Sequence, residues 1–441
     1  MGDVYARAQF NISATGGLTS DDGLFFDRDR FEVSPHVITL SSASKTPRKS
    51  GSYYFLDPSL WPTNISIAPL NQRGWVLQER TLAQRVLHFC RGQLFFECCE
   101  LDACEMFPAG LPSTSAFQHR MLGAPSTGHF KRPGAELDGA WLRETKSMGR
   151  LKSDLELNIF DVWAELVGSY SAMALTKWED KLIAFSSVAK MMARRLMSNE
   201  DDNERKIGQD GHLAELCRKH LPYHMLWSRR KDGGLRTEPM IYITLSWSWV
   251  SVQALVSLHP VTSRRTVDVE DHVEADDVLV DVLEAETFPA TEDPTGAVLR
   301  SFIRLRGFLR RAECAVWTPS PYSTERKETL LALTSGGGPA QIIVWPDETD
   351  QFAPQSAIRS KVFCLLILMW WNEKGDRCTE GLVLGDIEWE KDAFKRMGMF
   401  KIAIGSKEAE SKFYGVGGEE WAGRSAKEVV KGVKPLEERI V

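Results

Sequence analysis

The chain has 441 residues, of which 43% are hydrophobic and 26% charged, a composition that excludes a disordered or fibrous protein. At roughly 150 residues per domain, this length predicts two or three packing units. The 54 Lys plus Arg residues against 60 Asp plus Glu give a net charge of −6, without the basic excess of a nucleic-acid-binding protein, so nucleic acid is not an expected partner.

Neither a membrane segment nor an export signal is indicated. The most apolar run, Val362 to Trp371, has about half of the roughly 20 residues that a helix needs to cross a bilayer. The first residues, MGDVYARAQF, lack a charged segment followed by an apolar one, and Ala6 stands where a myristoylation signal needs Ser or Thr. The 8 cysteines lie mostly in apolar runs, as reduced and buried side chains do. We therefore expect a cytoplasmic protein that binds no membrane.

The first part of the chain has an α/β pattern. Residues 3–8 have the pattern of a helix end and residues 9–14 that of a strand. The most informative stretch is Asn71 to Cys99, which reads NQRGWVLQERTLAQRVLHFCRGQLFFECC. Asn71 can cap a helix over residues 74–82, and residues 85–89 and 94–98 alternate between apolar and polar on either side of a turn. This pattern predicts a helix followed by a β-hairpin.

One face of this predicted helix holds a carboxylate between large side chains: Trp75, Gln78, Glu79 and Leu82. Glu79 is therefore the candidate catalytic residue, and we expect it to be more than about half buried and bonded to an arginine. In the structural interpretation, the carboxylate forms an orienting ion pair with Arg73, Arg80 or Arg85. In the functional interpretation, it has a raised pKa in a cleft.

Two connectors separate this part from the rest of the chain. Residues 111–153 and 198–211 are rich in turn-forming and charged residues. Between them, residues 160–170 and 178–192 repeat apolar side chains at helical spacing, which predicts two amphipathic helices. The expected boundaries are 1–110 for the α/β part, 111–153 for a connector, 154–235 for a helical segment and 236–441 for a β-rich domain.

Short β-type runs characterise the C-terminal part and predict a mainly antiparallel β domain. The expected strands cover residues 240–247, 278–288, 299–308, 341–345, 361–371, 381–384 and 397–404.

Common catalytic and cofactor motifs are missing from the sequence. GxxxxGK[ST], GxGxxG, HExxH and GxSxG do not occur, so no cofactor is expected. Two groups of possible metal ligands fall short of the four ligands at regular spacing that structural zinc requires. These groups are Cys217, His220 and His224, and His88, Cys90, Cys98, Cys99 and Cys104. We expect no zinc at either.

The stretch RGW-x-LQER-x-L-x-x-R-x-L-x-F followed by QLFFEC resembles the C-terminal half of the fungal heterokaryon-incompatibility (HET) domain. The motif residues are Arg73, Gly74, Trp75, Gln78, Arg80 and Arg85. The start, MGDVYARAQFNISATGG, resembles the middle of that domain, and the segments 163–182, 246–252, 305–307, 380–384 and 396–400 resemble regions C-terminal to the domain in such proteins. The opening Tyr-x-x-Leu-Ser-Tyr-x-Trp-Gly strand of the family is not found, so residues 1–110 are expected to be the C-terminal half of a HET domain.

The resemblance implies a fold related to Toll/interleukin-receptor domains and a role in cell death after fusion of incompatible fungal cells. Two molecular functions are open. As a signalling module, the α/β part associates with protein partners, either a full-length HET-domain protein or itself, with Arg73, Trp75 and Arg80 as anchors. As an enzyme, it cleaves the nicotinamide–ribose bond of NAD, with Glu79 stabilising positive charge on the ribose. We expect the module rather than the enzyme, because half of the cleft is missing.

Overall fold

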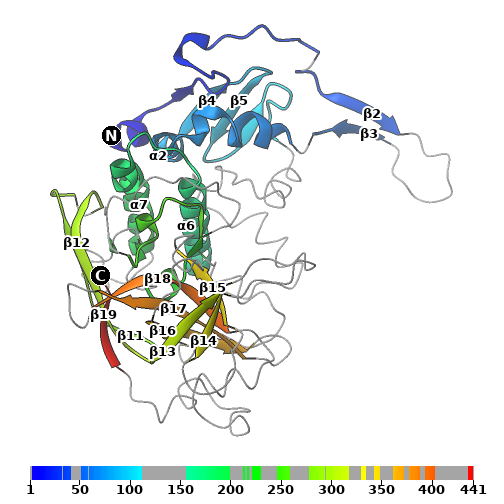
Figure 1. Ribbon diagram of the computed structural model, residues 1–441. Helices are drawn as coiled ribbons and strands as arrows, with labels where there is room; N and C mark the ends of the chain where they lie inside the picture. Colours follow the sequence, from blue (N-terminus) through cyan, green and yellow to red (C-terminus); the bar gives the residue numbers. More distant parts are fainter. Residues whose placement is uncertain are drawn as a thin grey trace. The chain divides into compact units, whose positions relative to one another are not determined.

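The computed structural model of the protein consists of two compact units (Figure 1). Unit 1 comprises Met1–Lys146 and Met173–Arg195, and unit 2 comprises Ser147–Ala172 and Leu196–Val441. The expected boundaries near residues 153 and 235 fall outside the described residues and stay predictions. The structure describes residues 2–31, 33–40, 51–57, 59–111, 155–198, 212–213, 216–217, 221–229, 246–258, 278–293, 295–316, 329–333, 342–347, 361–371, 377–387, 393–402 and 436–440.

A four-stranded sheet with the order β1-β4-β5-β6 forms the centre of unit 1. Strands β1 and β4 are parallel, whereas β4–β5 and β5–β6 are antiparallel. Both strands of the predicted hairpin are confirmed at the expected residues. The strands are β1 (Asn11–Ser13), β4 (Arg85–Phe89), β5 (Leu94–Cys98) and β6 (Asp102–Cys104).

Helix α2 (Gly74–Leu82) lies against one face of this sheet, which we call the inner face. The helix begins and ends where the sequence predicts. The π-helical turn η2 (Pro62–Ser66) covers a further part of the inner face. Because strand side chains alternate between faces, one apolar core collects side chains from η2 and the strands. Its buried members are Trp61, Ile65, Cys90, Phe95 and Cys104.

The opposite face of the sheet, which we call the outer face, carries the other half of the alternating side chains: Ile12, Leu87, Phe89, Leu94 and Phe96. Two aromatic rings from outside the sheet lie on it. Phe10 stacks on Phe96 with ring centroids 6.4 Å apart, and Phe25 meets the ring of Phe89 edge-on at 5.7 Å. These rings leave much of the face in contact with solvent.

A separate two-stranded ribbon also belongs to unit 1. Strands β2 (His36–Leu40) and β3 (Gly51–Phe55) pair antiparallel with each other and, among the described residues, with no other strand (Figure 1). Short helical elements complete the unit: α1 (Gly2–Arg7), η1 (Ser20–Asp22), η3 (Pro69–Gln72) and η4 (Trp178–Asp180), followed by α7 (Lys181–Ser198), which continues past the unit boundary.

The predicted amphipathic helices are confirmed as α6 (Leu155–Ser171), which belongs to unit 2, and α7. In α7 the helix proper begins at Lys181, because residues 178–180 form the η4 turn. No helix within the described residues combines the length and apolar character that a membrane span requires.

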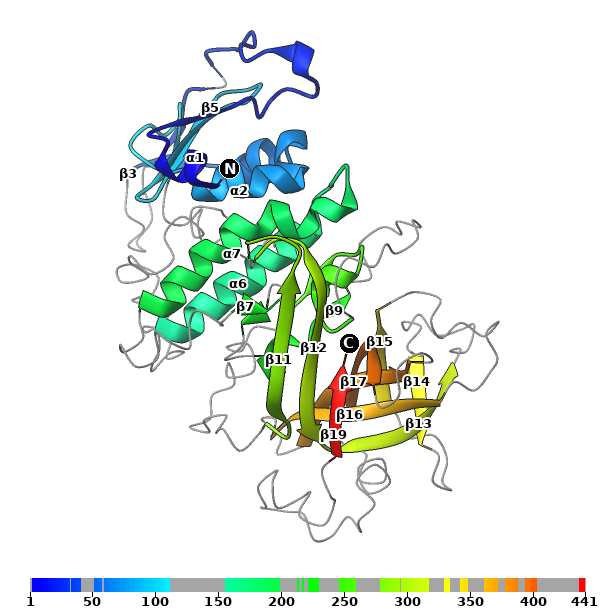
Figure 2. The ribbon, with the colours of Figure 1, turned by 90° about the vertical axis from the view of Figure 1, so that its left-hand side faces the viewer.

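Unit 2 is dominated by a nine-stranded sheet with the order β11-β12-β19-β18-β15-β14-β13-β16-β17. Strand β18 pairs with both β15 and β17. As a result, each of six strands pairs with two others of the same group: β13, β14, β15, β16, β17 and β18. Strands β11 and β12 form a long antiparallel pair beside β19 (Figure 2). All pairings in this sheet are antiparallel except that of β18 with β19. The mainly antiparallel character predicted for the C-terminal part is therefore confirmed.

Most of the predicted strands exist, with bounds that are shifted by one residue for β12 and β15, shorter for β11 and longer for β17 and β18. The predictions at 278–288, 299–308, 341–345, 381–384 and 397–404 correspond to β11 (Asp281–Pro289), β12 (Val298–Gly307), β15 (Ile342–Pro346), β17 (Arg377–Asp386) and β18 (Ala393–Ile402), and β16 (Lys361–Trp371) has the predicted bounds. Residues 240–245 lie outside the described residues, and Ser246 and Trp247 form a turn rather than a strand. Sequence analysis missed β13 (Leu309–Val316), β14 (Thr329–Leu333) and β19 (Leu436–Ile440).

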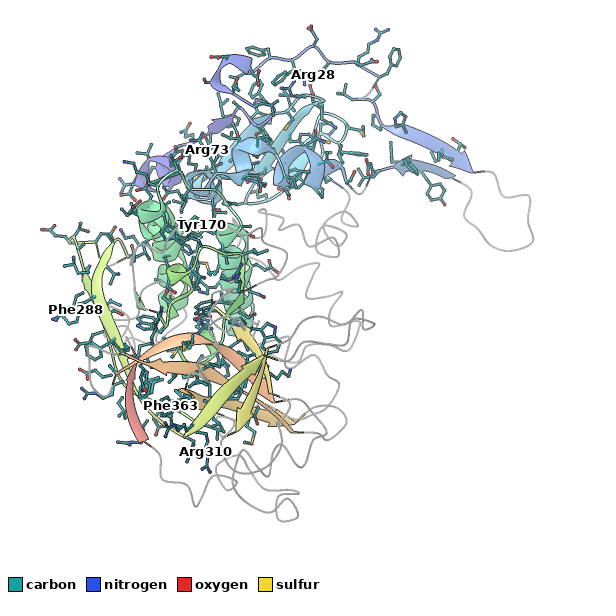
Figure 3. All side chains as sticks on the ribbon, in the orientation of Figure 1. Arg28, Arg73, Tyr170, Phe288, Arg310 and Phe363 are labelled. Atoms are coloured by element: carbon teal, nitrogen blue, oxygen red, sulfur yellow. The ribbon has the colours of Figure 1, made fainter. Side chains whose placement is uncertain are left out.

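The remaining elements of unit 2 are short: β7 (His212–Leu213), β8 (Leu216–Cys217), α8 (Leu221–His224), β9 (Ser228–Arg229), η7 (Trp249–Ser251) and β10 (Val256–Ser257). Packing within the large sheet is aromatic as well as aliphatic. The ring of Phe363 on β16, which is labelled in Figure 3, meets that of Phe394 on β18 edge-on, with centroids 5.1 Å apart.

Arg396 joins two distant segments in the core of unit 2. Its guanidinium pairs with Asp347, donates to the carbonyl oxygen of Trp227 at 2.6 Å and lies 3.5 Å from the centre of the Trp227 ring. The backbone N–H of Arg396 donates to the Ser246 hydroxyl at 2.9 Å. The segments around residues 246 and 396, both singled out in the sequence, thus meet in one buried network.

Candidate functional site

Helix α2 holds most of the sequence-predicted site residues, and its first turn is tied to the segment that precedes α7. The backbone N–H of Gly74 donates to the carbonyl oxygen of Ala174 at 2.8 Å, and the N–H of Ala174 donates to Gln72 at 2.7 Å. Asn71 was expected to cap the helix, and this was wrong. Arg73 occupies the N-cap position without a capping hydrogen bond from its side chain, and the Asn71 amide instead donates to the carbonyl oxygen of Ile65 at 2.7 Å.

The buried residues of α2 occupy somewhat more than half of the circumference of the helix: Gly74, Val76, Leu77, Gln78, Arg80 and Thr81. Trp75, Glu79 and Leu82 are half-buried. Trp75, Gln78, Glu79 and Leu82 therefore share one face of the helix, as predicted. This face borders the buried surface of α2, and only Gln78 is fully buried. Arg73 and Arg85 are exposed at the two ends of this segment.

Glu79 lies beside Tyr5 of α1. The Tyr5 hydroxyl donates a hydrogen bond to the Glu79 carboxylate, and the Arg73 guanidinium is close enough to act on the same charge. Burial raises the pKa of Glu79, while Tyr5 and Arg73 oppose that rise. Burial and the Glu79 charge likewise raise the pKa of Tyr5. The expectation of a bonded arginine was wrong, because the hydrogen-bond donor is a tyrosine.

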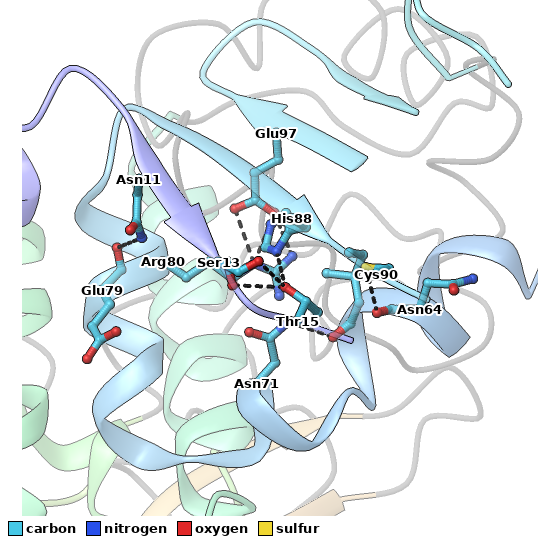
Figure 4. Close-up of polar contacts among 11 residues, drawn as sticks. Asn11, Ser13, Thr15, Asn64, Asn71, Glu79, Arg80, His88, Cys90 and Glu97 are labelled. Carbon is cyan, nitrogen blue, oxygen red and sulfur yellow. Dashed lines mark hydrogen bonds and ion pairs between the residues drawn. The ribbon is translucent and has the colours of Figure 1, made fainter. Parts of the chain in front are cut away.

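Arg80 faces the other way, toward the inner face of the sheet. Its Nε donates to Glu97 Oε1 at 3.2 Å and to Oε2 at 3.0 Å, and its Nη2 donates to Oε2 at 2.6 Å (Figure 4). The Glu97 side chain is 0% exposed and that of Arg80 is 7% exposed. The pair therefore joins helix to sheet inside the unit, and Arg80 is not available as an anchor for a partner.

A chain of polar side chains continues from this ion pair across the sheet. His88 Nε2 lies 3.5 Å from Glu97 Oε2, and His88 Nδ1 lies 2.8 Å from the Thr15 hydroxyl. That hydroxyl is in turn 2.8 Å from the Ser13 hydroxyl (Figure 4). His88, Glu97 and Thr15 are almost fully buried, so a solute cannot reach the hydroxyl that the histidine contacts. The order hydroxyl, imidazole, carboxylate is that of a hydrolase relay, but here it holds β1, β4 and β5 together.

The structure thus divides the predicted residues into two groups. Arg73 and Glu79 share the half-exposed site with Tyr5, and Arg80 belongs to the buried network. Sequence analysis did not single out Tyr5, Ser13, Thr15 and Glu97, which complete these groups, and it considered His88 only as a possible metal ligand. A usable signal existed for two of them, because the alternation of β4 and β5 places His88 and Glu97 on the same face as apolar Val86 and Phe95.

The cysteines of unit 1 form no disulfide bonds, and in the part of the chain that the structure describes no three or more His, Cys, Asp or Glu side chains gather as metal ligands. Burial raises the pKa of Cys90 to about 12, and its thiol donates to the carbonyl oxygen of Asn64 at 3.4 Å. Burial also raises the pKa of Cys104. In the group of Cys217, His220 and His224, His220 lies outside the described residues.

Comparison with known proteins gives one family. Residues 1–79 match the family described as heterokaryon incompatibility protein (HET), and the match ends at Glu79. The match covers the first 79 of the 441 residues and supports the presence of HET-domain sequence in this part of the chain. No curated protein and no solved structure matches the chain.

The buried ion pair predicts that removing one of its charges destabilises unit 1 more than removing both. Glu97→Leu leaves the Arg80 guanidinium buried without its counter-charge, so we expect the free energy of unfolding of unit 1 to fall by about 3–5 kcal/mol. Arg80→Met combined with Glu97→Leu removes both charges and should cost less than Glu97→Leu alone. Hydrogen exchange of the amides in residues 85–98 measures this.

The control is Arg28→Met, which breaks the more exposed Arg28–Glu105 pair and should change stability by at most about 1 kcal/mol. Additive losses in the double variant would show that Arg80 and Glu97 act independently.

The raised pKa of Glu79 predicts a pH dependence of stability. The Glu79 carboxyl binds its proton more readily in the folded state than in the unfolded chain. The contribution of this protonation to the free energy of unfolding is therefore present at low pH and is lost as the pH rises above the ordinary pKa of 4.5. Relative to Glu79→Gln, the wild-type chain should therefore lose stability between about pH 4 and pH 7. Denaturant midpoints across this range check it, with the exposed Glu100→Gln as control. A constant difference between wild type and Glu79→Gln contradicts it.

Proposed function

We propose that this chain, whose residues 1–79 carry the HET-family match, is a signalling and interaction module of the heterokaryon-incompatibility type. It acts in the cytoplasm of fungal cells, in non-self recognition and the resulting programmed cell death. Its α/β unit has a fold related to Toll/interleukin-receptor domains, and its partners are proteins, in particular a full-length HET-domain protein.

The outer face of the unit 1 sheet is the observation that carries this proposal. Phe10, Ile12 and Phe25 are 44%, 58% and 85% exposed there, over a layer of half-buried apolar strand residues. Exposed aromatic and aliphatic side chains on one surface are typical of sites where proteins bind one another. They supply the large apolar anchors that dominate binding energy at such sites.

The polar groups of unit 1 support the same conclusion. Arg80, Glu97 and His88 are engaged with one another inside the fold, where they join α2 to β4 and β5. A catalytic group has to reach its substrate, and these side chains are buried. The apolar side chains of the outer face, in contrast, are accessible to a partner.

The test is binding to a complete HET-domain protein from the same organism. Phe25→Asp places a charge at the most exposed ring of the outer face, so we expect at least about tenfold weaker binding, equivalent to about 1.4 kcal/mol. Phe31→Asp is the matched control, because Phe31 is 66% exposed in the same unit but has its contact with Arg30 rather than with the sheet. Equal binding by both variants, or no binding by the wild-type chain, contradicts the proposal.

A second function, cleavage of NAD at its nicotinamide–ribose bond, is favoured by one observation. Glu79 is half-buried, has a raised pKa and lies with the Tyr5 hydroxyl and the Arg73 guanidinium. A carboxylate next to a proton donor and a cation is suited to stabilising positive charge on a ribose while a phosphate group binds the arginine.

We expect no NAD turnover by the purified chain, because burial disfavours the charged form of Glu79 and the Tyr5 hydroxyl already occupies its carboxylate. Chromatographic separation of NAD from nicotinamide after long incubation measures this. Turnover that is lost in Glu79→Gln and retained in Glu100→Gln would establish the enzyme instead.

A further inference from the structure

The β2–β3 ribbon exposes an unusual number of large apolar side chains. Val37, Ile38, Tyr53, Tyr54 and Phe55 are between 45% and 65% exposed. In the antiparallel register, Val37 lies opposite Tyr54, Ile38 opposite Tyr53 and His36 opposite Phe55. Because side chains alternate, both faces of the ribbon are apolar. The Tyr54 ring meets Phe107 edge-on at 6.2 Å, so one face has a contact with the rest of unit 1.

The ribbon lacks the features that keep sheet edges apart. Its strands read HVITL and GSYYF, with no Lys, Arg, Asp, Glu or Pro in either. Natural proteins place charges, prolines or bulges on edge strands to prevent pairing with another chain. Within the described residues each strand has only the other as a neighbour, so each presents one edge.

A ribbon of this kind is also short of stabilising contacts. Two strands alone are marginally stable in water, and independent stability needs a third strand or a covered apolar face. An added strand therefore stabilises the ribbon more than it would stabilise a sheet of several strands. An added strand also has to be apolar and uncharged to suit its neighbours.

We propose that β3 pairs antiparallel with β3 of a second copy of this chain, around a two-fold axis at Tyr53. The two ribbons then form one four-stranded sheet in the order β2, β3, β3, β2. This inference goes beyond the proposed function and depends on the ribbon rather than on the outer face.

In this register the residues of β3 that lie opposite one another in the two copies are compatible. Tyr53 lies opposite the Tyr53 of the second copy, Gly51 opposite Phe55, and Ser52 opposite Tyr54. Aromatic pairs stabilise neighbouring strands, and an aromatic ring across from glycine covers the bare backbone there. No like charges meet, and the side chains of Ile38 and Tyr53 from both copies share one face. The same register centred on Ile38 of β2 instead places His36 opposite Leu40, a polar ring against an aliphatic chain.

The experiment is the molar mass of the 441-residue chain, measured by light scattering between about 1 and 100 μM. We expect a dimer, and for Tyr53→Lys a dissociation constant raised at least about tenfold, because two lysines would then lie directly opposite each other. Ile67→Lys is the control, since Ile67 is 65% exposed in unit 1 but outside the ribbon. A monomeric wild-type chain, or a dimer that Tyr53→Lys does not weaken, overturns the proposal.

A crosslink tests the register even where lysine unfolds the ribbon. Opposed residues in antiparallel strands have Cα atoms about 4.5–5.5 Å apart, within the range of a disulfide. Tyr53→Cys should therefore crosslink two chains on mild oxidation, above the background from the exposed Cys99 of the wild-type chain. Crosslinking through Ile38→Cys but not Tyr53→Cys overturns the assignment to β3. Loss of partner binding in Phe25→Asp with the dimer intact separates this proposal from the proposed function.

Discussion

One ion pair, between Arg80 and Glu97, determines how helix and sheet fit together in unit 1. Both side chains are buried, and three hydrogen bonds join them at 2.6 to 3.2 Å. A buried charge is costly without its partner, so the pair allows only arrangements of α2 and β5 that keep the two groups in contact. His88 and Thr15 extend the constraint to β4 and to the segment after β1. The orientation of the helix in turn determines which of its residues face solvent.

This constraint explains the position of Glu79. Adjacent residues on a helix point about 100° apart, so directing Arg80 into the sheet turns Glu79 to the margin of the helix. There it meets Tyr5 of α1 and remains half-exposed. Helix α2 thus carries two charged side chains with different surroundings: Arg80 is buried against β5, whereas Glu79 is half-exposed beside α1.

Charge and apolar surface are distributed in an unusual way in unit 1. Charged and polar side chains fill part of the inner face, whereas Phe10, Ile12 and Phe25 stand on the outer face in solvent. Unit 2 also contains a buried arginine, Arg396, which pairs with Asp347 and packs on Trp227. In both units a guanidinium group joins separate elements: Arg80 and Glu97 are 17 residues apart in the chain, and Arg396 and Trp227 are 169 residues apart. Arginine suits this role because its planar fork binds a carboxylate or carbonyl while its face stacks on an aromatic ring.

Local patterns in the sequence were enough to determine α2, β4 and β5 to the residue, because helical and strand periodicity and the intervening turn all occur within 25 consecutive residues. They also indicated the resemblance to HET domains, which the family match over residues 1–79 supports, and the antiparallel character of the C-terminal part. Strands β13, β14 and β19 escaped detection, because what makes them strands is pairing with partners elsewhere in the sheet.

The choice of partners was decided only by the tertiary structure. Glu79 had three arginines nearby in sequence, yet its hydrogen bond comes from Tyr5, and Arg80 pairs with a glutamate 17 residues away on a strand. Sequence spacing orders neighbours along one helix, but it contains no information on which face of the sheet that helix covers. Folding brings α1, α2 and β5 together, and only then do desolvation and hydrogen-bond geometry determine which charges pair and which stay at the surface.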